Sequence, residues 1–181
     1  LAMYGCARRL QKDGCDAIIV PCNTAHAFVP YLERHLDIPF INMQIATMEE
    51  IKAKLGDKAR IGLLATSGTV QTGKALNLPM FVPDELHQER VMAAIYGPLG
   101  AKAGYTDGQC REDLVSAAEY LVKTYDCNCL ILGCTELPLI LDECDDFVCA
   151  GKEVCVVDPT SALARKVVRI ATETNKARGT R

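Results

Sequence analysis

Two stretches of similar pattern, IIVPCNT at residues 18–24 and LILGCTE at residues 130–136, decide how this chain of 181 residues folds. Each begins with an apolar run that shows no polar alternation, as expected of a strand buried on both faces of a parallel sheet. One small or rigid residue follows, Pro21 or Gly133, and then a cysteine and polar side chains. The repeat predicts two buried strands, each with a cysteine just beyond its carboxyl end.

Strand and helix patterns alternate along the rest of the chain. We expect strands at residues 16–21, 39–43, 59–64, 127–132 and 154–157, with a weaker one at 81–83. We expect helices at residues 3–14, 25–35, 44–55, 85–96, 112–125 and 159–176, a hydroxyl-rich turn at 65–69, and a connection over 73–77 too short for a helix. Such alternation is typical of an α/β fold with a parallel sheet.

Composition narrows the function classes. Twenty Lys and Arg against 23 Asp and Glu give a net charge of −3, so we expect no nucleic-acid or anionic-membrane partner. No uncharged apolar run is long enough to span a bilayer, and Arg8 and Arg9 interrupt the pattern of a secretory signal. These features predict a cytoplasmic protein.

Ten cysteines are well above ordinary usage. In a reducing cytoplasm we expect free thiols, most of them packed as small hydrophobic side chains. Cys127 and Cys129 lie near Cys144, Cys149 and Cys155 in the sequence, but no CxxC pair occurs, so we expect no zinc or iron–sulfur site.

The chemistry is expected where the two motifs end. In parallel α/β folds, ligands bind outside the carboxyl ends of the strands, where Cys22 and Cys134 are placed. A helix that starts beside each cysteine would lower the pKa of its thiol. Two thiols on opposite faces of a small ligand could invert a stereocentre, because one removes the α-proton while the other supplies one from behind. Neither step needs a metal or an organic cofactor.

The two motifs also resemble those of a known family. PCNTAHAF at residues 21–28 and LILGCTELP at residues 130–138 are similar to the two cysteine signatures of the aspartate/glutamate racemase superfamily, most of all its aspartate racemase branch. The resemblance continues through residues 59–73, 82–85, 95–104 and 156–159. Glutamate racemases usually carry histidine where this chain has Glu136, which favours aspartate-type substrates.

The resemblance implies a cofactor-independent amino-acid racemase, expected as a homodimer. It implies two pseudo-symmetric, Rossmann-like α/β domains with parallel sheets and the site between them. We expect residues 1–43 plus 153–181 to form the first domain, incomplete at its N-terminus, and residues 44–152 to form the second.

Site residues follow by matching motif positions. Cys22 and Cys134 would be the two acid/bases. The substrate-binding side chains would be Asn23, Thr24 and Thr135 for the amino-acid head, Thr66 and Thr69 on the hydroxyl-rich turn, and Lys102 for a substrate carboxylate. His26 either tunes Cys22 or bonds a neighbouring backbone group. Glu136 either contacts the substrate, polarises Cys134 or caps a helix.

The chain departs from the family pattern at its start. Family members open with a strand, a GGMGP-like loop and a segment carrying an arginine, all of which would precede Leu1. We therefore expect the chain as given to be weakly active or inactive. Two alternatives stay open: a non-catalytic remnant of a racemase, and a related activity of the hydantoin racemase or maleate isomerase type.

Overall fold

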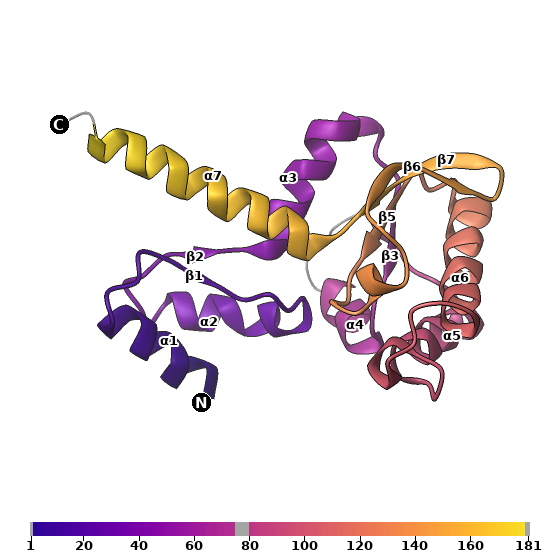
Figure 1. Ribbon diagram of the computed structural model, residues 1–181, viewed down its shortest axis with the longest axis horizontal. Helices are drawn as coiled ribbons and strands as arrows, with labels where there is room; N and C mark the ends of the chain where they lie inside the picture. The colour runs from indigo at the N-terminus through magenta and orange to yellow at the C-terminus, as the bar shows by residue number, and fades with distance from the viewer. Residues whose placement is uncertain (1, 75–79, 180–181) are drawn as a thin grey trace.

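The computed structural model describes residues 2–74 and 80–179, which build two sheets of unequal size (Figure 1). The smaller sheet pairs β1 (Ile18–Ile19) with β2 (Phe40–Ile41) in parallel, with Ile18 opposite Phe40. Helices α1 (Ala2–Lys12) and α2 (Val29–Glu33) flank it, and a small core of Ala7, Ile18 and Ile38 joins α1 to the strands.

The larger sheet has the strand order β4-β3-β5-β7-β6. Its strands are β3 (Ile61–Leu64), β4 (Met80–Phe81), β5 (Cys129–Leu132), β6 (Cys144–Cys149) and β7 (Lys152–Val157). All neighbours are parallel except β6, which runs antiparallel to β7. The predicted α/β class with parallel sheets is confirmed.

Helices cover both faces of the larger sheet (Figure 1). The longer helices are α3 (Met43–Leu55), α4 (Ser67–Lys74), α5 (Glu85–Tyr96), α6 (Gln109–Tyr125) and α7 (Pro159–Gly179). Short 3-10 turns are η1 (Thr24–Phe28), η2 (Gly56–Lys58), η3 (Ala101–Ala103) and η4 (Leu137–Leu139).

Side chains of β5 alternate between the two faces. Leu130 and Leu132 pack in the core shared with α5 and α6, whereas Ile131 packs on the opposite side with Ile51 of α3. Both sets are almost fully buried. Burial on two faces explains why the sequence of β5 is apolar at every position.

The structure differs from the predicted elements in four places. The first strand, expected over residues 16–21 and buried on both faces, is the two-residue β1, in which Ile19 is exposed. Residues 67–74 form α4 instead of part of a turn, and residues 25–35 form η1 followed by α2. Strand β6 was not predicted, because Asp145 and Asp146 are unusual in strands. They are tolerated since β6 is an edge strand whose pairing is irregular between Cys144 and Phe147.

The expected short connection lies partly outside the described residues, and the domain limits stay a prediction. Strand β7 belongs to the larger sheet, where Cys155 lies opposite Cys129. Helix α7 leaves β7, runs past α3 and extends over the smaller sheet (Figure 1). Within residues 2–74 and 80–179, none of the helices combines the length and apolar character needed to cross a bilayer.

An ion-pair network holds α7 against α3. Arg165 donates hydrogen bonds to Glu50 of α3 at 2.8 and 3.1 Å and to Glu143 at 2.7 and 3.0 Å. The next residue, Lys166, reaches both carboxylate oxygens of Glu49 at 2.9 Å. The carboxylates beside Arg165 raise the pKa of its guanidinium. These pairs join the two helices that carry the chain between the sheets.

Candidate active site

The second cysteine motif begins where β5 lies tightly against β3. The backbone N–H of Gly133 donates to the carbonyl of Leu64 at 2.7 Å, extending the pairing one residue beyond β5. A Cβ on Gly133 would lie 2.8 Å from Ala65 Cβ and from Leu63 Cδ1. Only glycine fits this approach, and it places Cys134 immediately beyond the sheet edge.

The first motif docks on the second through a side-chain amide. Asn23 Nδ2 donates to the carbonyl oxygen of Gly133 at 3.1 Å, across 110 residues of sequence. On its other side, the carbonyl of Asn23 accepts from Gln44 Nε2 of α3 at 3.5 Å. The residue after Cys22 is thus bonded to the residue before Cys134, which brings the two motifs together.

Threonine hydroxyls form a second link between the same segments. The hydroxyl oxygens of Thr24 and Thr69 share a hydrogen bond of 2.6 Å. Thr66, at the end of β3, donates to the Thr69 hydroxyl at 3.2 Å and accepts from the backbone N–H of Thr69 at 3.3 Å. The second contact is a typical N-terminal cap, which starts α4. Three of the predicted binding threonines therefore gather beyond β3.

His26 has a structural role. Its Nε2 accepts the backbone N–H of Met43 at 3.1 Å, so its Nδ1 carries the proton and donates to the carbonyl of Cys22 at 2.8 Å. His26 as a whole is 5% exposed, and both ring nitrogens are used. Of the two interpretations offered by the sequence, the contacts support bonding to the backbone: His26 fastens the Cys22 loop to the first turn of α3.

Cys134 lies in a hydrogen-bonded cluster of side chains. Its thiol donates to Glu136 Oε2 at 2.9 Å, and the Thr135 hydroxyl donates to the same oxygen at 2.9 Å. The other carboxylate oxygen of Glu136 accepts from Lys102 Nζ at 2.5 Å. The Lys102 ammonium also lies 5.4 Å from the ring centre of Tyr96.

The expected lowering of the Cys134 pKa is wrong. Burial, followed by the hydrogen bond to the Glu136 carboxylate, raises the pKa of the Cys134 thiol to about 11. The thiol and the Lys102 ammonium lower the pKa of Glu136 to about 2. The helix that was expected to favour the thiolate is only the three-residue turn η4, too short to outweigh a buried sulfur beside an anion.

The roles of two other predicted site residues, Cys22 and Lys102, stay predictions. Cys22 is exposed, and the turn η1 begins two residues after it. Lys102 is bonded to Glu136, so its contact with a substrate carboxylate stays a prediction. Sequence reasoning missed Gln44 and Tyr96, because each contacts a residue outside its own helix: Gln44 bonds to Asn23, and Tyr96 contacts Lys102.

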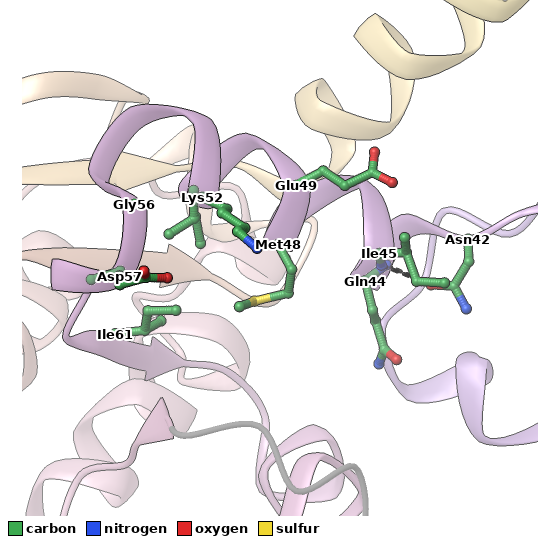
Figure 2. A pocket seen from close by; sticks show the side chains of 11 residues that line it. Asn42, Gln44, Ile45, Met48, Glu49, Lys52, Gly56, Asp57 and Ile61 are labelled. Atoms are coloured by element: carbon green, nitrogen blue, oxygen red, sulfur yellow. Dashed lines mark hydrogen bonds between the residues drawn. The ribbon is translucent and has the colours of Figure 1, made fainter.

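An apolar pocket of about 650 Å³ lies along α3, beside the start of β3 (Figure 2). Met48, Lys52 and Ile61 are among its lining residues. None of the predicted site residues lines it. Gln44 connects it to the cysteine motifs, because its side chain lines the pocket and bonds to Asn23. The candidate active site is therefore the paired motifs and not this pocket.

Comparison with known proteins identifies a family for the chain. Residues 1–167 match the family model described as Asp/Glu/Hydantoin racemase, a span that includes both cysteine motifs. The chain belongs to the Asp/Glu/hydantoin racemase family. Glutamate racemase of Shewanella sp. (strain MR-4) is 33% identical over 168 residues, which are 91% of this chain and 59% of that relative. Glutamate racemase of Haemophilus influenzae (strain PittGG) is 31% identical, over 91% of this chain and 60% of the relative.

Solved structures of the racemase family share the fold. An aspartate racemase homologue from Pyrococcus horikoshii OT3 superposes with a TM-score of 0.74 at 23% identity, covering 93% of this chain and 72% of that one. The aspartate racemase of Picrophilus torridus has a TM-score of 0.68 at 26% identity, covering 94% and 68%. The chain spans about three fifths of the length of the curated relatives it matches.

Proposed function

We propose that the chain carries the two-thiol centre of an amino-acid racemase that interconverts L- and D-aspartate by proton transfer at the α-carbon. The observation that carries the proposal is the hydrogen bond from Asn23 to the carbonyl of Gly133, which joins the two cysteine motifs. Membership of the racemase family adds independent support.

The chemistry requires one group that accepts a proton and one that donates it. In one direction of the reaction, the Cys22 thiolate removes the α-proton and the Cys134 thiol delivers its proton to the opposite face of the carbanion. The product is the other enantiomer, with Cys22 now protonated and Cys134 a thiolate. The reverse reaction exchanges these roles. Because both protons move between sulfur and carbon, the step needs no oxidant and no electron carrier.

Aspartate is the proposed substrate, with glutamate as the comparison. Glu136 stands where glutamate racemases usually have histidine, and Lys102 next to it can pair with a carboxylate. The curated relatives described above are named glutamate racemases, whereas the structural relatives include an aspartate racemase, a homologue of one and several glutamate racemases. Both amino acids therefore belong in the assay. Dimerisation and a cytoplasmic location stay predictions.

Exchange of the α-proton in heavy water tests the proposal. The purified chain spans only part of its relatives and is expected to be weakly active, so the NMR signal of the aspartate α-proton should disappear slowly as deuterium replaces it. Cys22→Ala and Cys134→Ala should each slow the exchange by about 100-fold or more, the usual range for loss of a general acid or base. Cys15→Ala removes another exposed thiol, outside both motifs, and should leave the exchange rate unchanged.

Two outcomes would contradict the proposal: no exchange by the wild-type chain, or exchange that survives both motif substitutions. Formation of an alkene isomer or release of CO2 without exchange would favour the maleate isomerase or decarboxylase type of activity.

A further inference from the structure

The carboxylate of Glu136 connects the Cys134 thiol to the Lys102 ammonium. Its Oε2 lies 2.9 Å from the sulfur and its Oε1 lies 2.5 Å from the Lys102 nitrogen. The three side chains come from separate places: Cys134 and Glu136 follow β5, whereas Lys102 belongs to η3 after α5. The Glu136 side chain is 21% exposed, and that of Lys102 is 44% exposed.

The hydrogen-bond pattern determines where the proton lies. An ionised carboxylate only accepts hydrogen bonds, and here it faces a thiol, a hydroxyl and an ammonium. The sulfur must therefore carry its hydrogen to make the 2.9 Å contact. A thiolate at the same position would be an anion beside an anion, so the arrangement favours the protonated form.

We propose that Glu136 is a positioning residue that keeps Cys134 protonated, so that Cys134 is the proton donor and Cys22 the base when the enzyme meets its substrate. This inference rests on the proposed function, since donor and base have meaning only for a two-thiol reaction.

The same carboxylate resets Cys134 after turnover. Delivery of the thiol proton to the α-carbon leaves a thiolate beside Glu136. Repulsion between the two anions favours the return of a proton from water to the Cys134 sulfur, while Cys22 releases to water the proton it took from the substrate; together the two transfers restore the donor and the base. Lys102 opposes this effect because its positive charge stabilises both anions. Glu136 and Lys102 should therefore act on the Cys134 thiol in opposite directions.

Thiol alkylation measures this effect without relying on racemase activity. We propose to treat the purified chain with iodoacetamide at pH 8.5 and to measure labelling of each cysteine by peptide mass spectrometry, with the exposed Cys15 as internal reference. Glu136→Gln should accelerate labelling of Cys134 about threefold. A one-unit fall in pKa raises the thiolate fraction up to about tenfold, and the weaker nucleophile offsets about a factor of three.

Two further variants show whether a change in the labelling rate of Cys134 comes from altered charge or from loosened packing. Lys102→Met should slow the labelling of Cys134 about threefold, whereas loosening of the cluster would accelerate it. Glu136→Asp keeps the carboxylate and should label more slowly than Glu136→Gln. Equal labelling of Cys134 in wild type and Glu136→Gln overturns the inference, as does acceleration by Lys102→Met. If Glu136→Gln does not fold by circular dichroism, the direction of the Lys102→Met effect decides.

The α-proton exchange of the same preparations keeps the two proposals apart. Opposite labelling effects without exchange by the wild type would support control of the thiol by Glu136 and overturn the racemase proposal. If the wild type exchanges the α-proton but Cys134 is labelled equally fast in wild type, Glu136→Gln and Lys102→Met, the racemase proposal is supported and the role of Glu136 is overturned.

Discussion

At the scale of single residues, Gly133 does two things that no other amino acid could do together. It lets β5 approach β3 closely enough for its N–H to bond to Leu64, and its carbonyl receives the amide of Asn23. The lack of a side chain is what allows the first contact. The position of Cys134 therefore depends on the packing of its neighbour.

A substitution at this position should be costly. Gly133→Ala forces a Cβ to within 2.8 Å of two apolar side-chain atoms, and we expect a loss of about 1–3 kcal/mol in the free energy of unfolding. Urea denaturation followed by circular dichroism measures the loss.

Gly68→Ala is the matched control. Gly68 lies in α4, where an added Cβ meets only Thr24 Cγ2 at 3.7 Å. This substitution should be neutral or stabilise the chain by up to about 1 kcal/mol, because alanine favours a helix. Equal destabilisation by both substitutions would show that close packing at Gly133 is not the cause.

The sequence predicted that each cysteine follows a buried strand. Cys134 lies two residues beyond β5, which is buried throughout, whereas Cys22 lies three residues beyond β1, in which Ile18 is buried but Ile19 is exposed. The sequence did not predict the protonation of Cys134. That property depends on Lys102 and Glu136 meeting across 34 residues, and on a turn beyond Cys134 that proved to be short. Local sequence patterns predict where strands end, whereas the pKa of a thiol depends on residues that only the folded structure brings close to it.

At the scale of elements, the start of α3 is the junction between the smaller sheet and the candidate site. Asn42 caps the helix, with its side-chain oxygen accepting from the N–H groups of Gln44 and Ile45 at 2.8 and 3.1 Å. The preceding N–H, that of Met43, donates to His26 Nε2. The helix that carries Gln44 toward Asn23 thus begins at a fixed point.

Removing this helix cap should lower the stability of the folded chain. Asn42→Ala leaves two N–H groups of the first turn without their side-chain acceptor, and we expect a loss of about 1 kcal/mol in the free energy of unfolding. Asn42→Asp retains the acceptor and should lose little. Thermal and urea denaturation of the two variants, compared with wild type, measure the difference; similar losses in both would contradict capping as the reason.

Helix α3 was predicted closely, whereas β6 and α4 were not. The boundaries of α3 are marked by a capping asparagine and by Gly56, both visible in the sequence. Strand β6 forms because it pairs with the free edge of β7. Asp145 and Asp146 in β6 are unusual in strands, so the sequence there did not predict one. Helix α4 begins with Ser67 and Gly68, which are more typical of turns, and tertiary contacts such as that of Thr69 with Thr24 favour the helix.

At the scale of the whole molecule, α3 and α7 cross between the two sheets side by side (Figure 1). Their contact includes the ion pairs of Arg165 with Glu50 and of Lys166 with Glu49. Glu143 adds a partner for Arg165 from the segment between η4 and β6. The relative placement of the sheets therefore has an electrostatic part, which salt can weaken.

Arg165→Met should reveal this part. We expect a loss of about 1 kcal/mol in the free energy of unfolding at low ionic strength, because a doubly paired guanidinium network exceeds a single surface pair. The loss should shrink in 1 M NaCl.

Arg169→Met provides the comparison, since Arg169 approaches Glu49 only to 3.7 Å and its side chain is 62% exposed. Its effect should be close to zero at either ionic strength. A loss at Arg165 that salt does not change would mean that its aliphatic stem, not its charge, stabilises the helix pair.

The bond between Asn23 and Gly133 is asymmetric in a way that bears on how the family can vary. Asn23 contributes its own side chain, but Gly133 contributes a main-chain oxygen, which every amino acid carries. Mutation can therefore erase the contact directly from one side only. A substitution of Asn23 in the first motif would remove the hydrogen bond between the two cysteine motifs. The second motif keeps its acceptor, the carbonyl of residue 133, as long as the backbone path there is unchanged.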